Sequence, residues 1–156
     1  MSTSLEIDAI DRRILGIIQQ DTTLSISDIG QQVGLSSNPC WRRIKRMEDA
    51  GIIERRVAIL NSAKLGLGVT AFVSIRTDKH TPEWLASFAE GVRSIPEIIE
   101  CHRMSGDVDY LLKIAVSDIA HYDRIYQHLI AAVPGLSDVS STFSMERLKY
   151  GTALAV

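Results

Sequence analysis

The sequence has little cysteine and no long apolar run. Its two cysteines, Cys40 and Cys101, are far apart and lie in apolar patterns, which excludes the disulfide framework of a small secreted domain and predicts buried free thiols. No stretch approaches the roughly 20 apolar residues of a membrane-spanning helix. The start, MSTSLEID, lacks the basic and apolar regions of a signal peptide. We therefore expect a globular, cytoplasmic protein with no membrane partner.

Motifs for catalysis and for cofactor binding are also missing. The sequence contains no GxGxxG, Walker or GxSxG motif, and Gly66-Leu67-Gly68 is typical of a hinge rather than of a phosphate loop. The four histidines show neither HExxH spacing nor cysteine pairs at metal-ligand spacing. These absences predict a protein that is not an enzyme and that has no cofactor and no metal site.

What the sequence does contain is a capped pair of short helices between Leu24 and Ile53. Ser25 and Asp28 are spaced to cap the first helix, and Gly34 is placed to end it in a left-handed conformation. Ser36 is placed to cap the second helix, with Pro39 in its first turn. Two helices joined by a tight turn are typical of a helix-turn-helix DNA reader.

The second helix carries four cations and no anion before Glu48, although the whole chain has a net charge of −2. An ordinary solvated helix face mixes both signs, so a single-signed run favours contact with DNA phosphates, and polar residues at the helix start can face the major groove. The predicted DNA-binding residues are Ser36, Ser37, Asn38, Trp41, Arg42, Arg43, Lys45 and Arg46.

A helix before this pair begins after Asp8, with Asp11 at the capping-box position. The segment IIERRVAIL that follows the pair predicts either a small wing or an extended arm, in which Arg55 and Arg56 are equally consistent with phosphate contacts and with ordinary solvated positions. Residues 1–60 are thus predicted to form a winged helix-turn-helix domain, residues 61–68 a hinge, and residues 69–156 a second domain.

The second domain is predicted to be α+β, with the element order βαββαβ of a ferredoxin-like fold. Strands are expected at 69–77, 98–104, 110–116 and 139–148, with helices opened by Thr81-Pro82 and Asp118. Both helices would lie on one face of an antiparallel sheet. The other face needs a cover, so we expect a homodimer.

Several segments, in a fixed order over nearly the whole chain, resemble one known family. IDAIDRRIL, VGLSSNPC followed by RRIKRMEDAGII, SGDVDYLLKI and RLKYGTAL are similar to the Lrp/AsnC, or feast/famine, transcriptional regulators. The resemblance implies a C-terminal domain that binds a small molecule, commonly an amino acid, and homodimers that assemble into tetramers or octamers. Trp41, Ser37-Asn38 and Ser141 depart from the residues usual in the family.

The turn within SGDVD offers the chemistry that an amino-acid effector needs. Gly106 allows close approach of the backbone, and Asp107 or Asp109 can accept hydrogen bonds from an ammonium group. The same residues are also good hairpin-turn residues without a ligand, and it is the family resemblance that favours a binding site. The predicted effector-binding residues are Ser105, Gly106, Asp107, Asp109 and Ser141.

The function predicted from the sequence is a sequence-specific transcriptional regulator. It would bind double-stranded operator DNA at the nucleoid and respond to an amino acid or a related metabolite. The alternative is an architectural DNA-wrapping protein that works without an effector.

Overall fold

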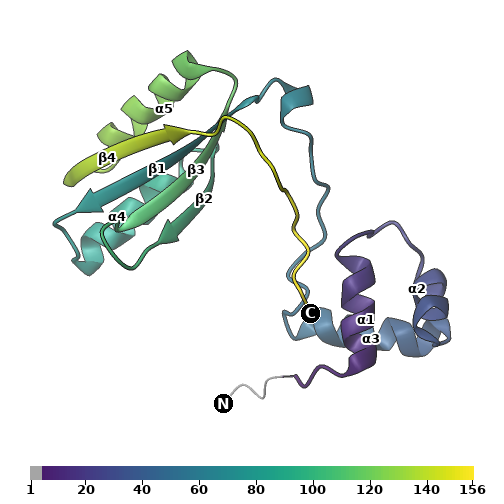
Figure 1. Cartoon of the computed structure of the whole chain (residues 1–156). Coiled ribbons are helices and arrows are strands. Elements are labelled where there is room, and N and C mark those ends of the chain that lie inside the picture. Colours follow the sequence, from purple (N-terminus) through teal and green to yellow (C-terminus); the bar gives the residue numbers. More distant parts are fainter. Residues whose placement is uncertain (1–4) are drawn as a thin grey trace. The chain divides into compact units, whose positions relative to one another are not determined.

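The computed structural model describes residues 5–156, so Met1–Ser4, the first half of the MSTSLEID segment, lie outside the described residues. The chain divides into two compact units (Figure 1). One unit contains the residues up to Ile59 together with Lys149–Val156, and the other contains Leu60–Leu148. Within residues 5–156, no helix has the length and apolar composition needed to cross a membrane.

Three helices form the first unit: α1 (Ala9–Ile18), α2 (Ile26–Val33) and α3 (Ser37–Asp49). Both predicted capping boxes are confirmed, Asp8 with Asp11 on α1 and Ser25 with Asp28 on α2. Gly34 ends α2 with φ 77°, in the left-handed conformation that glycine adopts without strain. The buried core comprises Ile14, Ile18, Ile29, Val33, Cys40, Ile44 and Met47.

The segment after α3 contains no strand in residues 52–61, so the extended arm, and not a hairpin, is the form that this structure takes. The C-terminal tail, yellow in Figure 1, lies against the same unit. The side-chain amide of Gln19 donates to the carbonyl of Leu154 at 2.8 Å and accepts from its N–H at 2.8 Å. Residues 149–156 therefore lie with the first unit, whereas the sequence predicts them in the second domain.

The second unit has four strands and two helices in the predicted order. They are β1 (Val69–Thr77), α4 (Pro82–Arg93), β2 (Ile98–Arg103), β3 (Tyr110–Val116), α5 (Ile119–Ala132) and β4 (Leu136–Phe143). A short 3-10 helix (Ala63–Leu65) precedes β1, within the predicted hinge. The sheet is antiparallel, with the order β2-β3-β1-β4. Figure 1 shows α4 and α5 together on one face of it.

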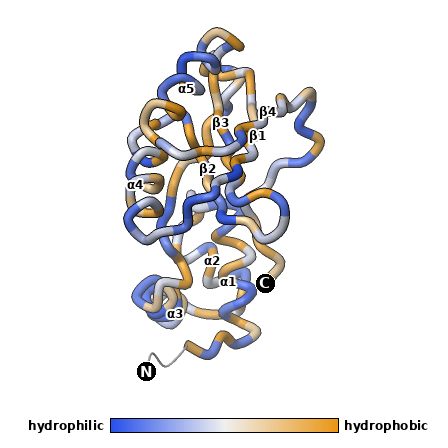
Figure 2. The backbone as a smooth tube through the Cα atoms, turned by 90° about the vertical axis from the view of Figure 1, so that its left-hand side faces the viewer, coloured by the Kyte–Doolittle hydropathy of each residue, from blue (hydrophilic) through white to orange (hydrophobic). Residues whose placement is uncertain are grey.

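Alternation along the strands decides which residues face the helices. On β3 the side chains of Tyr110, Leu112, Ile114 and Val116 are buried and the three residues between them are half-buried. In Figure 2 β3 is mostly orange, whereas α3 is mostly blue, in line with its charged sequence. From α4, Trp84 and Phe88 stack with ring centroids 5.2 Å apart, and the indole N–H of Trp84 donates to the carbonyl of Pro134 at 2.7 Å.

Three details differ from the sequence-based predictions. β4 begins at Leu136 and ends at Phe143, earlier at both ends than the predicted strand 139–148. Cys40 is buried as expected, but Cys101 is exposed because β2 lies at the edge of the sheet. β2 ends at Arg103, one residue before the end of the predicted strand 98–104.

Gly30 of α2 provides a test of how tightly the helix-turn-helix is packed. A Cβ atom at this position would lie 2.7 Å from the backbone carbonyl oxygen of Leu35, and a backbone atom cannot move away cheaply. We expect Gly30→Ala to lower the free energy of unfolding by about 1–3 kcal/mol, the usual cost of overpacking. The measurement is chemical denaturation followed by circular dichroism.

Gly16 of α1 is the matched control, because a Cβ there would meet nothing within 4 Å. Gly16→Ala should leave stability unchanged or raise it by up to about 1 kcal/mol, through better helix propensity. Equal effects of the two substitutions would contradict the close approach at Gly30.

Candidate nucleic-acid interface

The start of α3 presents an exposed polar surface. Ser36, Ser37 and Asn38 are all exposed, and Trp41 is 53% exposed one turn further on. Ser36 occupies the N-cap position, but its side chain makes no cap hydrogen bond, whereas the N-cap side chains of α1, α2, α4 and α5 all do. The prediction that the Ser36 hydroxyl caps α3 is therefore wrong. This leaves polar groups at the helix start free to contact another molecule.

In the structure, the positive charges on α3 are partly compensated by carboxylates from outside this helix. Nη1 of Arg43 donates to Asp8 Oδ2 at 2.7 Å and to Asp11 Oδ1 at 2.8 Å. Nη2 of Arg46 donates to Asp11 Oδ2 at 2.7 Å. The sequence suggests an uncompensated cationic run, and the structure corrects this, because α1 places two carboxylates directly beside it.

Asp11 joins these two helices from a fully buried position. Its side chain is 0% exposed, and its two carboxylate oxygens accept hydrogen bonds from Arg43, Arg46 and the backbone N–H of Asp8. Asp8 is half exposed, and hydrogen bonds from the Asp11 backbone and from Arg43 lower the pKa of its carboxyl from the usual 3.8 to about 2. Hydrogen bonds to Asp8 and Asp11 in turn raise the pKa of Arg43. Asp8 and Arg43 are thus ionised at neutral pH.

The other cations of this unit differ in their surroundings. Lys45 pairs with Asp49 at 2.7 Å, one helical turn along α3. Arg56 of the arm pairs with Glu48 at 2.8 Å, which makes it a solvated ion-pair residue in this structure. Arg42 is exposed, and no carboxylate within residues 5–156 pairs with it. An open hollow of about 320 Å³ on α3 is lined by Pro39, Arg42, Arg43 and Arg46.

In the second unit, the predicted effector residues fall into two groups. Ser105, Gly106 and Asp107 form the exposed tip of the turn between β2 and β3, where Gly106 has φ 116° and open space around it. Asp109 lies at the base of the turn, and its Oδ2 accepts a hydrogen bond from the backbone N–H of Thr77 at 2.8 Å. Asp109 thus ties the turn to the end of β1.

Ser141 is not brought to this turn. It lies on β4, where it pairs in register with Val73 of β1, and β1 lies between β4 and the β2–β3 hairpin. Its hydroxyl hydrogen-bonds the phenol of Tyr122 on α5. Ser141 therefore belongs to the packing between the sheet and α5, and we remove it from the candidate effector residues.

Comparison with known proteins decides the family. The model of the Lrp/AsnC ligand-binding domain matches residues 70–154, and that of a winged helix-turn-helix DNA-binding domain matches residues 7–54. The chain belongs to the Lrp/AsnC family. It is a DNA-binding transcriptional regulator of this type, in a family of regulators rather than enzymes.

Individual relatives agree over almost the full length. The DNA-binding transcriptional activator DecR of Escherichia coli K12 is 47% identical over 150 residues, which cover 96% of this chain and 99% of DecR. The crystal structure of an AsnC family regulator from Agrobacterium tumefaciens is similar with a TM-score of 0.90 and 54% identity, covering 94% and 95% of the two chains. A regulator from Neisseria meningitidis, solved as a complex with L-Met, has a TM-score of 0.89 and 31% identity, covering 96% of each chain.

The main feature that the sequence-based prediction missed is the partnership of Asp8 and Asp11 with α3. Their capping role is readable from local spacing, but their arginine partners lie 32–35 residues away in the sequence. One signal was available: Asp11 falls on the same helical face as Ile14 and Ile18, and an acidic residue on an apolar face requires a cation partner.

Proposed function

We propose that this Lrp/AsnC regulator reads operator DNA with α3 and responds to an amino acid bound at the turn of its second unit. The observation that carries the first part is the exposed, polar and cationic surface along α3. The uncapped helix start offers amides and hydroxyls, Arg42 offers an unpaired guanidinium, and Trp41 offers an apolar edge. These are the groups that proteins use for phosphates and for base edges in the major groove. Binding DNA would place the protein at the nucleoid.

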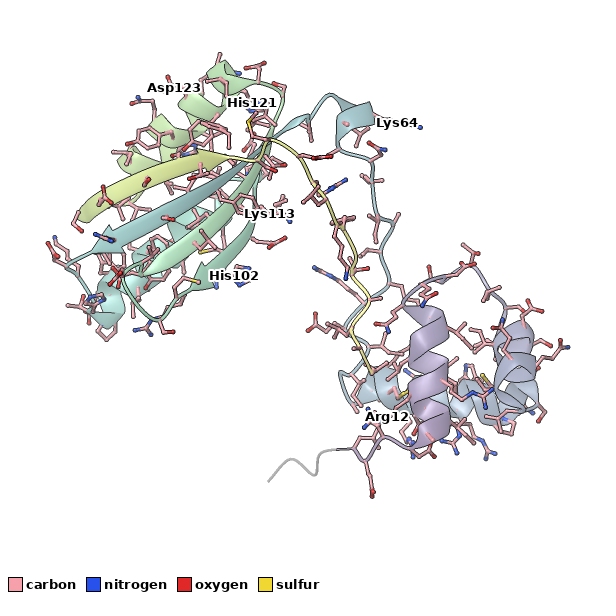
Figure 3. The ribbon with its side chains drawn as sticks, viewed as in Figure 1. Arg12, Lys64, His102, Lys113, His121 and Asp123 are labelled. Carbon is pink, nitrogen blue, oxygen red and sulfur yellow. The ribbon has the colours of Figure 1, made fainter. Side chains whose placement is uncertain are left out.

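We expect Arg42→Ala to weaken binding to all duplexes and to reduce the slope of log K against log salt by about one, as for loss of one phosphate contact. The measurement is fluorescence anisotropy of a labelled duplex over a salt series. Arg12→Ala is the control, because Arg12 is an exposed cation on α1 (Figure 3). A relaxed base preference at one position would instead make Arg42 a base-reading residue, and an unchanged affinity would remove it from the interface.

We also propose that a second copy of the chain covers the open face of the sheet. Figure 3 shows Lys113 and His102 on the face that α4 and α5 leave uncovered. Lys113 pairs with Glu100 at 2.6 Å, so this face carries a neutralised pair beside Phe72, which is 38% exposed on a central strand. A neutral surface with an apolar centre suits a two-fold contact with itself. Further assembly to tetramers or octamers is the corresponding expectation for the family.

Phe72→Glu should therefore shift the full-length protein toward monomer in multi-angle light scattering. Buried carboxylates facing each other across a two-fold axis would repel and lose hydration. Ile130→Glu on α5 is the matched control, since Ile130 is 39% exposed but lies on a helix. A Phe72→Glu protein with the wild-type mass would contradict the proposed interface.

The effector part of the proposal is centred on the tip of the β2–β3 turn. The matched ligand-binding domain includes this turn, and a related regulator was solved with L-Met. Asp107 is exposed at the tip and is the carboxylate we assign to the ligand ammonium, because one oxygen of Asp109 already serves the Thr77 amide. Ser105 and Gly106 supply backbone groups beside it.

Calorimetry with a panel of amino acids tests this assignment. Wild type should give saturable heat with at least one of them. Asp107→Asn should lower the affinity for that amino acid by about tenfold to a hundredfold, as for loss of a charged hydrogen bond. Substituting Gly106 is less informative, since any side chain is strained at φ 116°. Asp123→Asn on α5 is the control (Figure 3). No saturable heat with any member of the panel would favour the alternative, an architectural DNA-wrapping protein without an effector.

A further inference from the structure

The cations of α3 are divided by their carboxylate partners. Arg43 and Arg46 share two carboxylates, so this group of four side chains has no net charge. Their side chains are nevertheless 27% and 46% exposed, and both line the open hollow beside Arg42. The same guanidinium groups thus touch carboxylates on one side and the solvent-facing hollow on the other.

The carboxylates occupy some of the guanidinium donors that a DNA phosphate could use. Nη1 of Arg43 lies between an oxygen of Asp8 and an oxygen of Asp11, and Nη2 of Arg46 is held by Asp11. A phosphate entering the hollow would compete for these guanidinium groups. A phosphate bound to these arginines would also lie close to both carboxylates, and salt screens such short-range repulsion only in part, since the Debye length is about 8 Å at physiological ionic strength.

We propose that Asp8 and Asp11 act as internal competitors of DNA phosphate, holding Arg43 and Arg46 so that α3 binds the DNA backbone less tightly than its four cations would allow. This inference rests on the proposed docking of α3 on DNA. Competition by these carboxylates lowers the affinity for DNA of any sequence, since that affinity depends on the number of phosphates neutralised. A larger share of operator binding then comes from contacts to bases.

Asp8→Asn is the variant that isolates this effect. Asn is as good an N-cap residue as Asp, so the hydrogen bonds from the Ile10 and Asp11 backbones can be kept while the charge beside Arg43 is removed. Asp11→Asn removes the shared charge, but Asp11 is fully buried and this variant is expected to lose stability. A change in DNA binding in Asp8→Asn therefore reports on competition for Arg43, whereas a change in Asp11→Asn also reflects the stability of the fold.

The experiment measures binding of the full-length protein to a duplex of arbitrary sequence over a salt series. Asp8→Asn should bind several-fold more tightly than wild type, with a salt slope steeper by up to about one, because Arg43 then has one carboxylate partner, Asp11, instead of two and can also contact a phosphate. Asp21→Asn is the matched control: it makes the same charge change in the α1–α2 loop, where, among residues 5–156, the carboxylate bonds only Thr23. Circular dichroism checks that each variant is folded.

A double-mutant cycle with Arg43→Gln tests the partner directly. In the wild-type background this substitution should change the salt slope by less than one half, since Arg43 is already held by carboxylates. In the Asp8→Asn background it should abolish the whole gain in affinity and slope. Coupling of this sign is not expected if Asp8 serves only to cap α1.

Three results would overturn the inference while leaving the docking of α3 on DNA intact. Asp8→Asn with wild-type affinity and slope would show that the carboxylate does not compete. A folded Asp8→Asn protein with weaker binding would show that Asp8 orients Arg43 for a phosphate. An equal gain in Asp21→Asn would show a general effect of net charge. If the protein does not bind the duplex, or if Arg42→Ala leaves the affinity unchanged, the proposed docking of α3 fails and this inference fails with it. If Arg42→Ala weakens binding as expected but Asp8→Asn does not strengthen it, only the inference is refuted.

Discussion

The carboxylate of Asp11 is the interaction on which the DNA-binding unit depends. It is fully buried, and it accepts hydrogen bonds from two arginines of α3 while it completes the capping box of α1. A buried charge is tolerated only when its oxygens are all partnered, so the start of α1 and the middle of α3 must meet in one arrangement. The apolar core beneath, centred on Ile14, Ile44 and Met47, favours burial but does not by itself fix that arrangement.

The second unit depends on a different constraint, the alternation of side chains on a sheet that has helices on one face only. Tyr110, Leu112 and Ile114 point toward the helices, and Lys113 between them points away. The same alternation places the side chain of Ser141 on the face under α5, where it bonds Tyr122. The turn at Ser105–Asp107, in contrast, is exposed. Position relative to this sheet therefore distinguishes packing residues from residues that are free to meet a ligand or a second chain.

Local rules explain most of what could be predicted for the fold. Caps at Asp8, Ser25, Thr81 and Asp118 and the left-handed Gly34 act within a few residues, and each lies where its spacing predicts. The exception is Ser36, which has the N-cap backbone conformation without the hydrogen bond. The end of β4 was less predictable, because it depends on how far the pairing with β1 extends, and the register between the two strands stops at Phe143, opposite Ala71.

The sequence by itself determined the two-part organisation, the βαββαβ order, the family resemblance and the exposed start of α3, because these follow from periodicity and short-range capping. Only the tertiary structure decided which charges meet. Asp11 and Arg46 are 35 positions apart, and Gln19 and Leu154 are 135 apart. Such pairs form only when folding closes a long loop, and nothing in the local sequence encodes a partner at that separation. The availability of each α3 cation to DNA is set by those distant partners.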